Sequence, residues 1–98
     1  MTKRRDVQQT VVKALQKGLV LSTEKTKARS EGGKQTVTVG PRRTAVPDGC
    51  PYQVIYWRKG AQVQDAYRSV YDLARAFIAF VGRDLAYAAA IRALAQGR

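Results

Sequence analysis

The chain has 98 residues, of which 45% are hydrophobic and 26% charged, and this composition favours one small globular domain with a modest core over a disordered chain. It contains no His and a single Cys, Cys50, which excludes His-based catalysis, a disulfide within the chain and zinc sites rich in Cys and His. We therefore expect no enzymatic activity, no cofactor and no bound metal.

The positive charge is concentrated in the first part of the sequence. Residues 1–60 contain thirteen Lys and Arg against four acidic residues, a balance of +9, whereas residues 61–98 contribute only +2 of the total of +11. A basic half on so short a chain is typical of proteins that bind nucleic acid.

The apolar segments do not indicate a membrane protein. The longest apolar run, residues 73–82, is interrupted by Arg75 and is much shorter than the roughly 20 residues that a membrane span needs. The first residues lack the features of a secretory signal. We expect no membrane partner and a cytoplasmic location.

Residues 1–5 are predicted to form a basic flexible tail, because they contain Lys and Arg and nothing apolar that would anchor them except the initial Met. Residues 6–98 are predicted to form a single domain. From Asp6, apolar residues recur at helical spacing at Val7, Val11 and Leu15, and Gly18 is a plausible end for this first helix.

The segment at about 22–34, STEKTKARSEGGK, has one Ala, no larger hydrophobic residue and two adjacent Gly. This composition predicts a flexible basic loop.

Three strands are predicted next. Residues 35–40 alternate Val with Thr, and residues 52–59, YQVIYWRK, are rich in aromatic and β-branched residues. The segment between them, residues 41–51, contains three Pro and an Asp-Gly pair and must turn. Lys59-Gly60 offers a tight turn into a third strand over residues 61–68.

The last third of the chain changes to a helical period. Ser69 can cap a helix whose first turn contains Asp72, and Gly82 can separate it from a second, Ala-rich helix that ends near Gln96. Two alternatives remain open at this stage: residues 63–81 can be read as one helix with a heptad stripe, and the final helix can run uninterrupted through Gly82.

Together these elements predict an α+β fold with an N-terminal helix, a three-stranded antiparallel sheet, and two C-terminal helices packed on one face of the sheet. The first C-terminal helix is apolar nearly all round, which suggests that a second copy helps to cover it. The residues expected at such a homodimer contact are Leu73, Phe77, Phe80 and Val81.

The other face of the sheet is the expected binding surface. With alternate residues turned inward, this face carries Thr36, Thr38, Gln53, Ile55, Trp57, Lys59, Gln62, Gln64 and Arg68. Gln and Arg can read base edges, Lys can hold phosphate, and Trp can stack. The competing interpretation is that Ile55 and Trp57 belong to the core and that the amides form an ordinary solvated face.

Basic residues outside the sheet centre are expected to contact phosphate without reading sequence. The complete set of predicted nucleic-acid-binding residues is Lys3, Arg4, Arg5, Lys25, Lys27, Arg29, Lys34, Arg42, Arg43, Gln53, Trp57, Arg58, Lys59, Gln62, Gln64 and Arg68.

Two stretches resemble parts of known families. The pattern of strand, turn, strand and helix in YQVIYWRKGAQVQDAYRSVYDLARAF resembles the small three-stranded DNA-binding modules of plant transcription factors and of integrase arm-binding domains. That resemblance implies a sheet that enters the major groove. Separately, PYQVIYWRKG is similar to a core strand hairpin of the RelE and ParE toxins, although those proteins place a helical hairpin before the sheet.

The leading hypothesis is a non-enzymatic DNA-binding protein, a regulatory or accessory factor of a bacterium, plasmid or virus, that favours duplex DNA over RNA. A toxin-like protein directed at RNA or the ribosome is the first alternative, with Tyr52, Tyr56 or Trp57 stacking on bases. A module or inhibitor that binds an acidic partner protein is the second.

Overall fold

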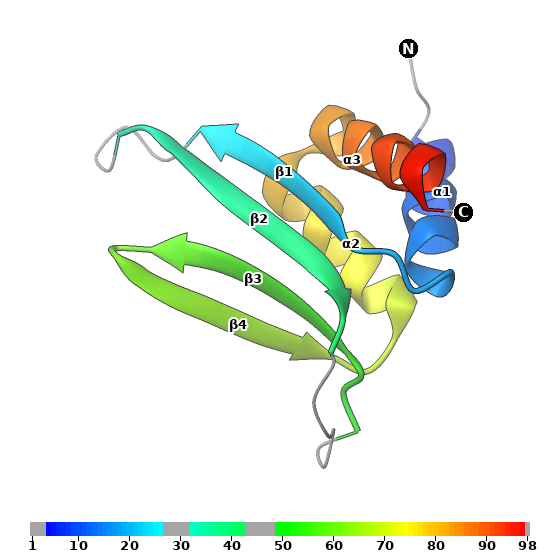
Figure 1. Ribbon diagram of the computed structural model, residues 1–98, viewed down its shortest axis with the longest axis horizontal. Coiled ribbons are helices and arrows are strands. Elements are labelled where there is room, and N and C mark those ends of the chain that lie inside the picture. Colours follow the sequence, from blue (N-terminus) through cyan, green and yellow to red (C-terminus); the bar gives the residue numbers. More distant parts are fainter. Residues whose placement is uncertain (1–3, 27–31, 43–48, 98) are drawn as a thin grey trace.

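A computed structural model describes residues 4–26, 32–42 and 49–97 of the chain (Figure 1). Its elements follow the order α1 (Arg4–Gln16), β1 (Leu21–Thr26), β2 (Lys34–Pro41), β3 (Tyr52–Arg58), β4 (Ala61–Tyr67), α2 (Val70–Val81) and α3 (Arg83–Gln96). The fold is α+β, as predicted, with one N-terminal and two C-terminal helices on a sheet.

The sheet has four antiparallel strands in the order β1-β2-β3-β4, so the prediction of three strands was wrong. The additional strand, β1, lies in the segment 22–34 that was predicted to be a loop. Its first two inward positions are Leu21 and Thr23, which are buried opposite Val39 and Val37. Because β1 buries a single large hydrophobic side chain, its sequence LSTEKT lacks the alternation that reveals a strand.

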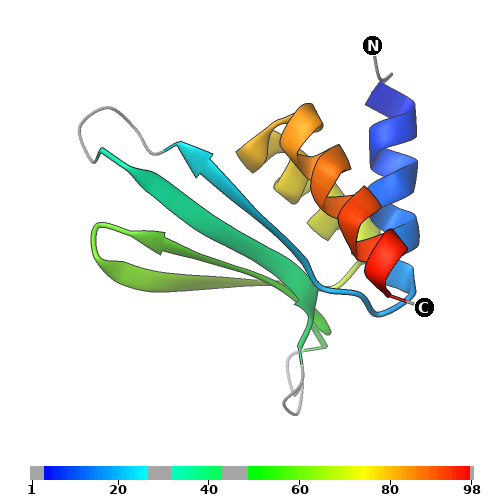
Figure 2. The same ribbon diagram turned by 45° about the horizontal axis from the view of Figure 1, so that its top comes forward.

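The helices lie on one face of the sheet (Figures 1 and 2). Helix α2 packs against β2, β3 and β4, α3 packs against β1, and α1 packs mainly against α2 and α3. The core between these layers is one cluster that takes buried residues from all three helices and from β1, β2 and β3. Phe77 of α2 is the largest fully buried side chain.

Helix α1 begins at Arg4, so Arg4 and Arg5 form its first turn and do not belong to a basic tail. Residues 1–3, the rest of the predicted tail, lie outside the described residues. The predicted apolar positions Val7, Val11 and Leu15 are buried as expected. The predicted α1 is thus confirmed in its packing and extended at its start.

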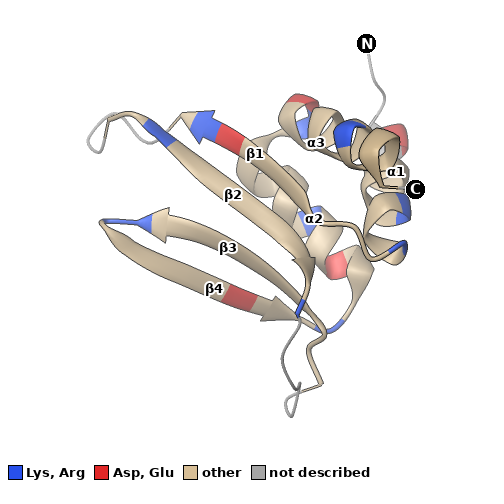
Figure 3. Ribbon diagram, in the orientation of Figure 1, with Lys and Arg blue, Asp and Glu red and all other residues tan. Residues whose placement is uncertain are grey.

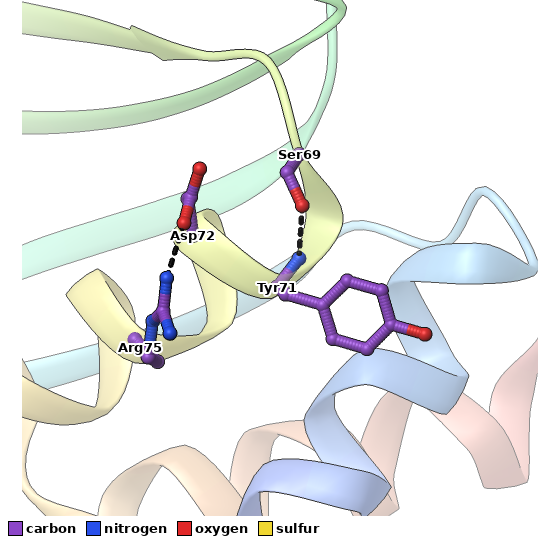
Figure 4. Close-up of polar contacts among 4 residues, drawn as sticks. All are labelled: Ser69, Tyr71, Asp72 and Arg75. Carbon is purple, nitrogen blue, oxygen red and sulfur yellow. Dashed lines mark hydrogen bonds and ion pairs between the residues drawn. The ribbon is translucent and has the colours of Figure 1, made fainter.

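Helix α2 begins where the sequence indicates. Ser69 has extended backbone angles, and its hydroxyl accepts a hydrogen bond of 3.1 Å from the backbone N–H of Tyr71 (Figure 4). Asp72 in the first turn pairs with Arg75 one turn later. Since residues 61–67 form strand β4, the alternative of one helix over residues 63–81 is wrong.

Gly82 separates α2 from α3, with a φ of 93° that only Gly adopts readily. The alternative of an uninterrupted helix is therefore also wrong. Helix α3 presents its small side chains Ala86, Ala89 and Ala90 to the core, which permits the close approach of α1.

The four residues predicted to form a dimer contact are covered within a single chain. Leu73, Phe77 and Val81 are buried, and Phe80 is half-buried with its ring centroid 4.8 Å from that of Tyr56. Leu73, Phe77 and Val81 therefore belong to the core of one chain, and Phe80 packs at its edge; the homodimer itself stays a prediction.

Candidate nucleic-acid interface

None of the described helices covers the second face of the sheet, which we call the outer face. Strand alternation and register place on it one set of side chains from each strand. Its members are Ser22, Glu24 and Thr26 of β1, Lys34, Thr36, Thr38 and Gly40 of β2, Gln53, Ile55 and Trp57 of β3, and Gln62, Gln64 and Ala66 of β4.

Trp57 is on the outer face and not in the core. Its side chain is 48% exposed and lies opposite Gln62 in the register of β3 and β4. The next residue inward along β3, Tyr56, faces the helices and packs on Phe80. The backbone carbonyl of Trp57 accepts a hydrogen bond from the buried side chain of Gln35 on β2, which ties the two strands together at this point.

The outer face is hollowed toward the end of the sheet where β2 finishes and β3 begins. A depression of about 410 Å³ is lined by Val20, Thr38, Gly40, Pro41, Gln53, Ile55 and Gln64. Gly40 contributes no side chain here, and a Cβ at this position would lie 3.2 Å from a methyl group of Val20. The depression thus combines two carboxamides with aliphatic side chains.

The cations of the sheet lie at its two ends (Figure 3). Lys34, Arg58 and Lys59 lie at the end where both hairpins turn, and Arg42 and Arg68 directly follow β2 and β4 at the opposite end. The seven residues of β3 and of β4 separate these ends by roughly 20 Å. Within the described strands, Glu24 is the single acid on the outer face.

Lys25 was predicted to bind nucleic acid, but the structure engages it inside the fold. Its alternation on β1 directs it to the inner face, where its Nζ donates a hydrogen bond of 2.9 Å to the carbonyl of Phe80. The same ammonium lies 4.1 Å from the centre of the Phe80 ring. This cation joins β1 to the end of α2 and is removed from the interface.

The remaining predicted residues are placed as follows. Gln53, Trp57, Gln62 and Gln64 come together on the outer face, Lys34, Arg42, Lys59 and Arg68 flank it, and Arg58 is exposed at an inward position at the end of β3. Arg42 also donates a hydrogen bond of 3.0 Å to the carbonyl of Cys50. Arg4 and Arg5 lie in α1, and Lys3, Lys27, Arg29 and Arg43 lie outside the described residues.

The sequence did not indicate that Val20, Gly40 and Pro41 line the depression. Val20 precedes a strand that was not predicted, so its proximity to Gly40 could not be inferred. The sequence Val-Gly-Pro at residues 39–41 could have indicated the depression, because a Gly at an outward strand position leaves space beside it.

Tyr67 lies beneath this surface on the inner face, opposite Tyr52. Burial raises the pKa of its hydroxyl above the ordinary value, and Asp65 and Tyr56 add to this rise. The effect keeps Tyr67 neutral, in keeping with its contact with the core.

Comparison with known proteins found no family model, curated protein or solved structure that matches the chain. Of the helices in the described part of the chain, none is both long and apolar enough to cross a bilayer. The function proposed below therefore depends on the chemistry of the residues themselves.

Proposed function

We propose that the protein binds duplex DNA through the outer face of its sheet. The observation that carries this proposal is the distribution of groups on that face: neutral hydrogen-bonding side chains in the centre and cations at both ends. Central amides and methyl groups suit base edges, and cations at the ends suit the phosphates on either side.

The dimensions support the same function. The major groove is about 12 Å wide and admits a two-stranded ribbon, whereas the two cationic ends of the β3–β4 ribbon are roughly 20 Å apart. A ribbon seated in the groove would place its central side chains against the bases and its ends near the two backbones. Strand β4 is an edge strand, so no neighbouring strand stands in the way of this approach.

A salt-series titration tests the proposal. If Lys34, Arg42, Lys59 and Arg68 each neutralise a phosphate, the logarithm of the affinity for duplex DNA should fall against the logarithm of salt concentration with a slope of about −4. Lys34→Ala should make the slope shallower by about one, because Lys34 is an exposed residue of the outer face. Lys13→Ala, on the exposed side of α1, is the matched control and should leave it unchanged.

The same titration distinguishes the two alternatives. The half-exposed Trp57 favours single-stranded RNA or DNA as the second candidate, since an indole can stack on a base. Tighter binding to single strands, abolished by Trp57→Ala in a folded protein, would replace duplex DNA with that target. Absence of salt-dependent binding to any nucleic acid would leave an acidic protein partner as the explanation of the charge.

A further inference from the structure

The glutamines of the outer face bear on which base pairs are bound, beyond a general affinity for DNA. We infer that the β3–β4 ribbon, together with Thr38 of the adjoining β2, reads A·T base pairs in the major groove. Gln53, Gln62 and Gln64 contact adenine, and Ile55 and Thr38 contact the thymine methyl group. This inference rests on the proposed binding of duplex DNA.

The chemistry of the glutamine side chain supplies the first step. A carboxamide presents one acceptor oxygen and a donor NH₂ group side by side. Adenine presents the complementary pair in the major groove, an acceptor at N7 and a donor at N6, so one glutamine can make two hydrogen bonds to it. A guanine in the same place presents two acceptors and cannot satisfy the glutamine oxygen.

The neighbours of these amides supply the second step. Gln64 lies directly opposite Ile55, which in turn lies opposite Thr38, so an amide and two methyl-bearing side chains form one row across three strands. Gln53 joins Gln64 in lining the same depression. Methyl-bearing side chains beside an amide suit an A·T pair, because the thymine methyl group lies on the same major-groove edge as the N7 and N6 atoms of adenine.

The positions of the cations supply the third step. Guanine is read in the major groove mainly by Arg or Lys, through its O6 and N7 atoms. In the described part of the chain, no Lys or Arg occupies an outward position between Gln53 and Trp57 on β3 or between Gln62 and Ala66 on β4. The centre of the ribbon therefore lacks the groups that would favour G·C pairs.

The aromatic content of the face argues against single-stranded targets. Proteins that bind single strands stack successive bases on several aromatic side chains. Trp57 is the one aromatic residue among the described residues of the outer face, while Tyr52, Tyr56 and Tyr67 are on the opposite face and pack against the core. A single indole beside Gln62 suits a contact at the margin of the groove better than the stacking of successive bases.

Modified duplexes test the inference without altering the protein. Duplexes of equal length and identical ends are compared with an A·T or a G·C centre, by fluorescence anisotropy at one salt concentration. We expect the A·T centre to bind at least about fivefold more tightly, since each bidentate base contact discriminates by about that factor or more.

Three base analogues then locate the contacts. Deoxyuridine in place of thymidine removes only the methyl group, and 7-deazaadenine removes only the N7 acceptor; each should weaken binding several-fold. Diaminopurine in place of adenine adds an amino group in the minor groove and should have no effect, because the ribbon lies in the other groove.

A pair of variants assigns the preference to the ribbon. Gln64→Ala should lower the affinity for the A·T duplex by about fivefold or more and leave the affinity for the G·C duplex unchanged. Gln16→Ala, an exposed amide on α1, is the matched control and should change neither. Circular dichroism confirms that both variants keep the fold.

Each contrary result has a distinct meaning. Salt-dependent binding with equal affinity for both centres, or a preference for G·C, overturns the inference and leaves the proposed function standing. Weaker binding to the diaminopurine duplex moves the contact to the minor groove and also overturns it. Failure to bind any duplex overturns the inference together with the proposed function.

Discussion

Lys59 combines an exposed charge with an unfavourable backbone conformation. It has a φ of 52°, the single positive value among the described residues other than Gly, and Gly60 follows with a φ of 79°. A two-residue hairpin loop in which both residues have positive φ is a type I′ turn, for which Asn-Gly is the preferred sequence. The chain keeps a Lys where an Asn would be more stable, which points to a use for the charge at this tip.

Replacing Lys59 by Asn should therefore have opposite effects on stability and binding. We expect a gain in the free energy of unfolding of up to about 1 kcal/mol, because Asn tolerates the left-handed region better. DNA affinity should fall, with a salt slope shallower by about one. Urea unfolding and the salt titration measure the two effects. Unchanged affinity would show that Lys59 contacts no phosphate.

The raised pKa of Tyr67 predicts a dependence of stability on alkaline pH. Burial is the main cause of this rise, so the folded state favours the neutral hydroxyl. That contribution is fully present below the unfolded-state pKa of about 10 and is lost as the pH rises through the higher folded-state value. Tyr67→Phe cannot ionise and should lose less stability between about pH 9 and pH 11.

Denaturant unfolding at a series of pH values measures this difference. The exposed Tyr71→Phe is the matched control for removal of a hydroxyl. Parallel pH profiles for the wild type and Tyr67→Phe would contradict the prediction.

At the scale of elements, the start of α2 depends on one side chain. The Ser69 hydroxyl accepts a hydrogen bond from a backbone N–H that the helix itself cannot satisfy. Ser69→Ala should lower the free energy of unfolding by about 1 kcal/mol, whereas Ser69→Asn should restore most of it. Urea unfolding measures both, and equal loss in the two variants would show that the hydroxyl does not act as a cap.

The sequence predicted those elements whose apolar residues repeat at a regular spacing. Helices α1 and α2 and strand β2 were found in this way, because their buried residues recur at helical spacing or at period 2. The other elements carried different signals: aromatic and β-branched residues for β3, the turn at Lys59-Gly60 for β4, and an Ala-rich run after Gly82 for α3. Strand β1 was missed because Thr23 and Lys25 occupy inward positions that hydrophobic residues usually fill. Its burial depends on α3 and on Phe80, which no local pattern reveals.

The residues of the candidate interface also differ in how far the sequence alone could place them. Alternation along β3 and β4 was enough to place Gln53, Trp57 and Gln64 on one face. The inward position of Lys25 and the contact of Val20 with Gly40 depend on β1 and its pairing, so they could not be predicted. Local sequence thus determined the centre of the interface, and tertiary packing determined its margin.

At the scale of the whole molecule, sheet and helices share one core. Phe77 lies within it at 0% exposure, and its removal should cost about 3–5 kcal/mol, a large part of the 5–15 kcal/mol that stabilises a typical domain. Phe77→Ala should lower the midpoint of a single unfolding transition. Because one cluster joins all layers, circular dichroism and the fluorescence of Trp57 should report the same midpoint. Two separate midpoints would contradict a shared core.

The packing of α1 on α3 brings together the helices that are furthest apart in the sequence, whereas each strand pairs with its neighbour in the chain. Closing a hairpin orders few residues, and docking α1 closes a loop of most of the chain, so the sheet should form first and α1 should dock last.

Val11→Ala, with a cost of about 2 kcal/mol, should speed unfolding and leave the folding rate unchanged, and Val39→Ala should slow folding. Stopped-flow kinetics measure both, and slowed folding in Val11→Ala would place α1 in the nucleus.

This order of assembly has a consequence for the protein at high concentration. Until α1 docks, the sides of α2 and α3 that it covers are open to solvent, and apolar surface exposed in this way promotes aggregation. The yield of refolding would then be set by how quickly α1 reaches its place. A basic chain with a net charge of +11 has some protection during that interval, since like charges keep partly folded copies apart.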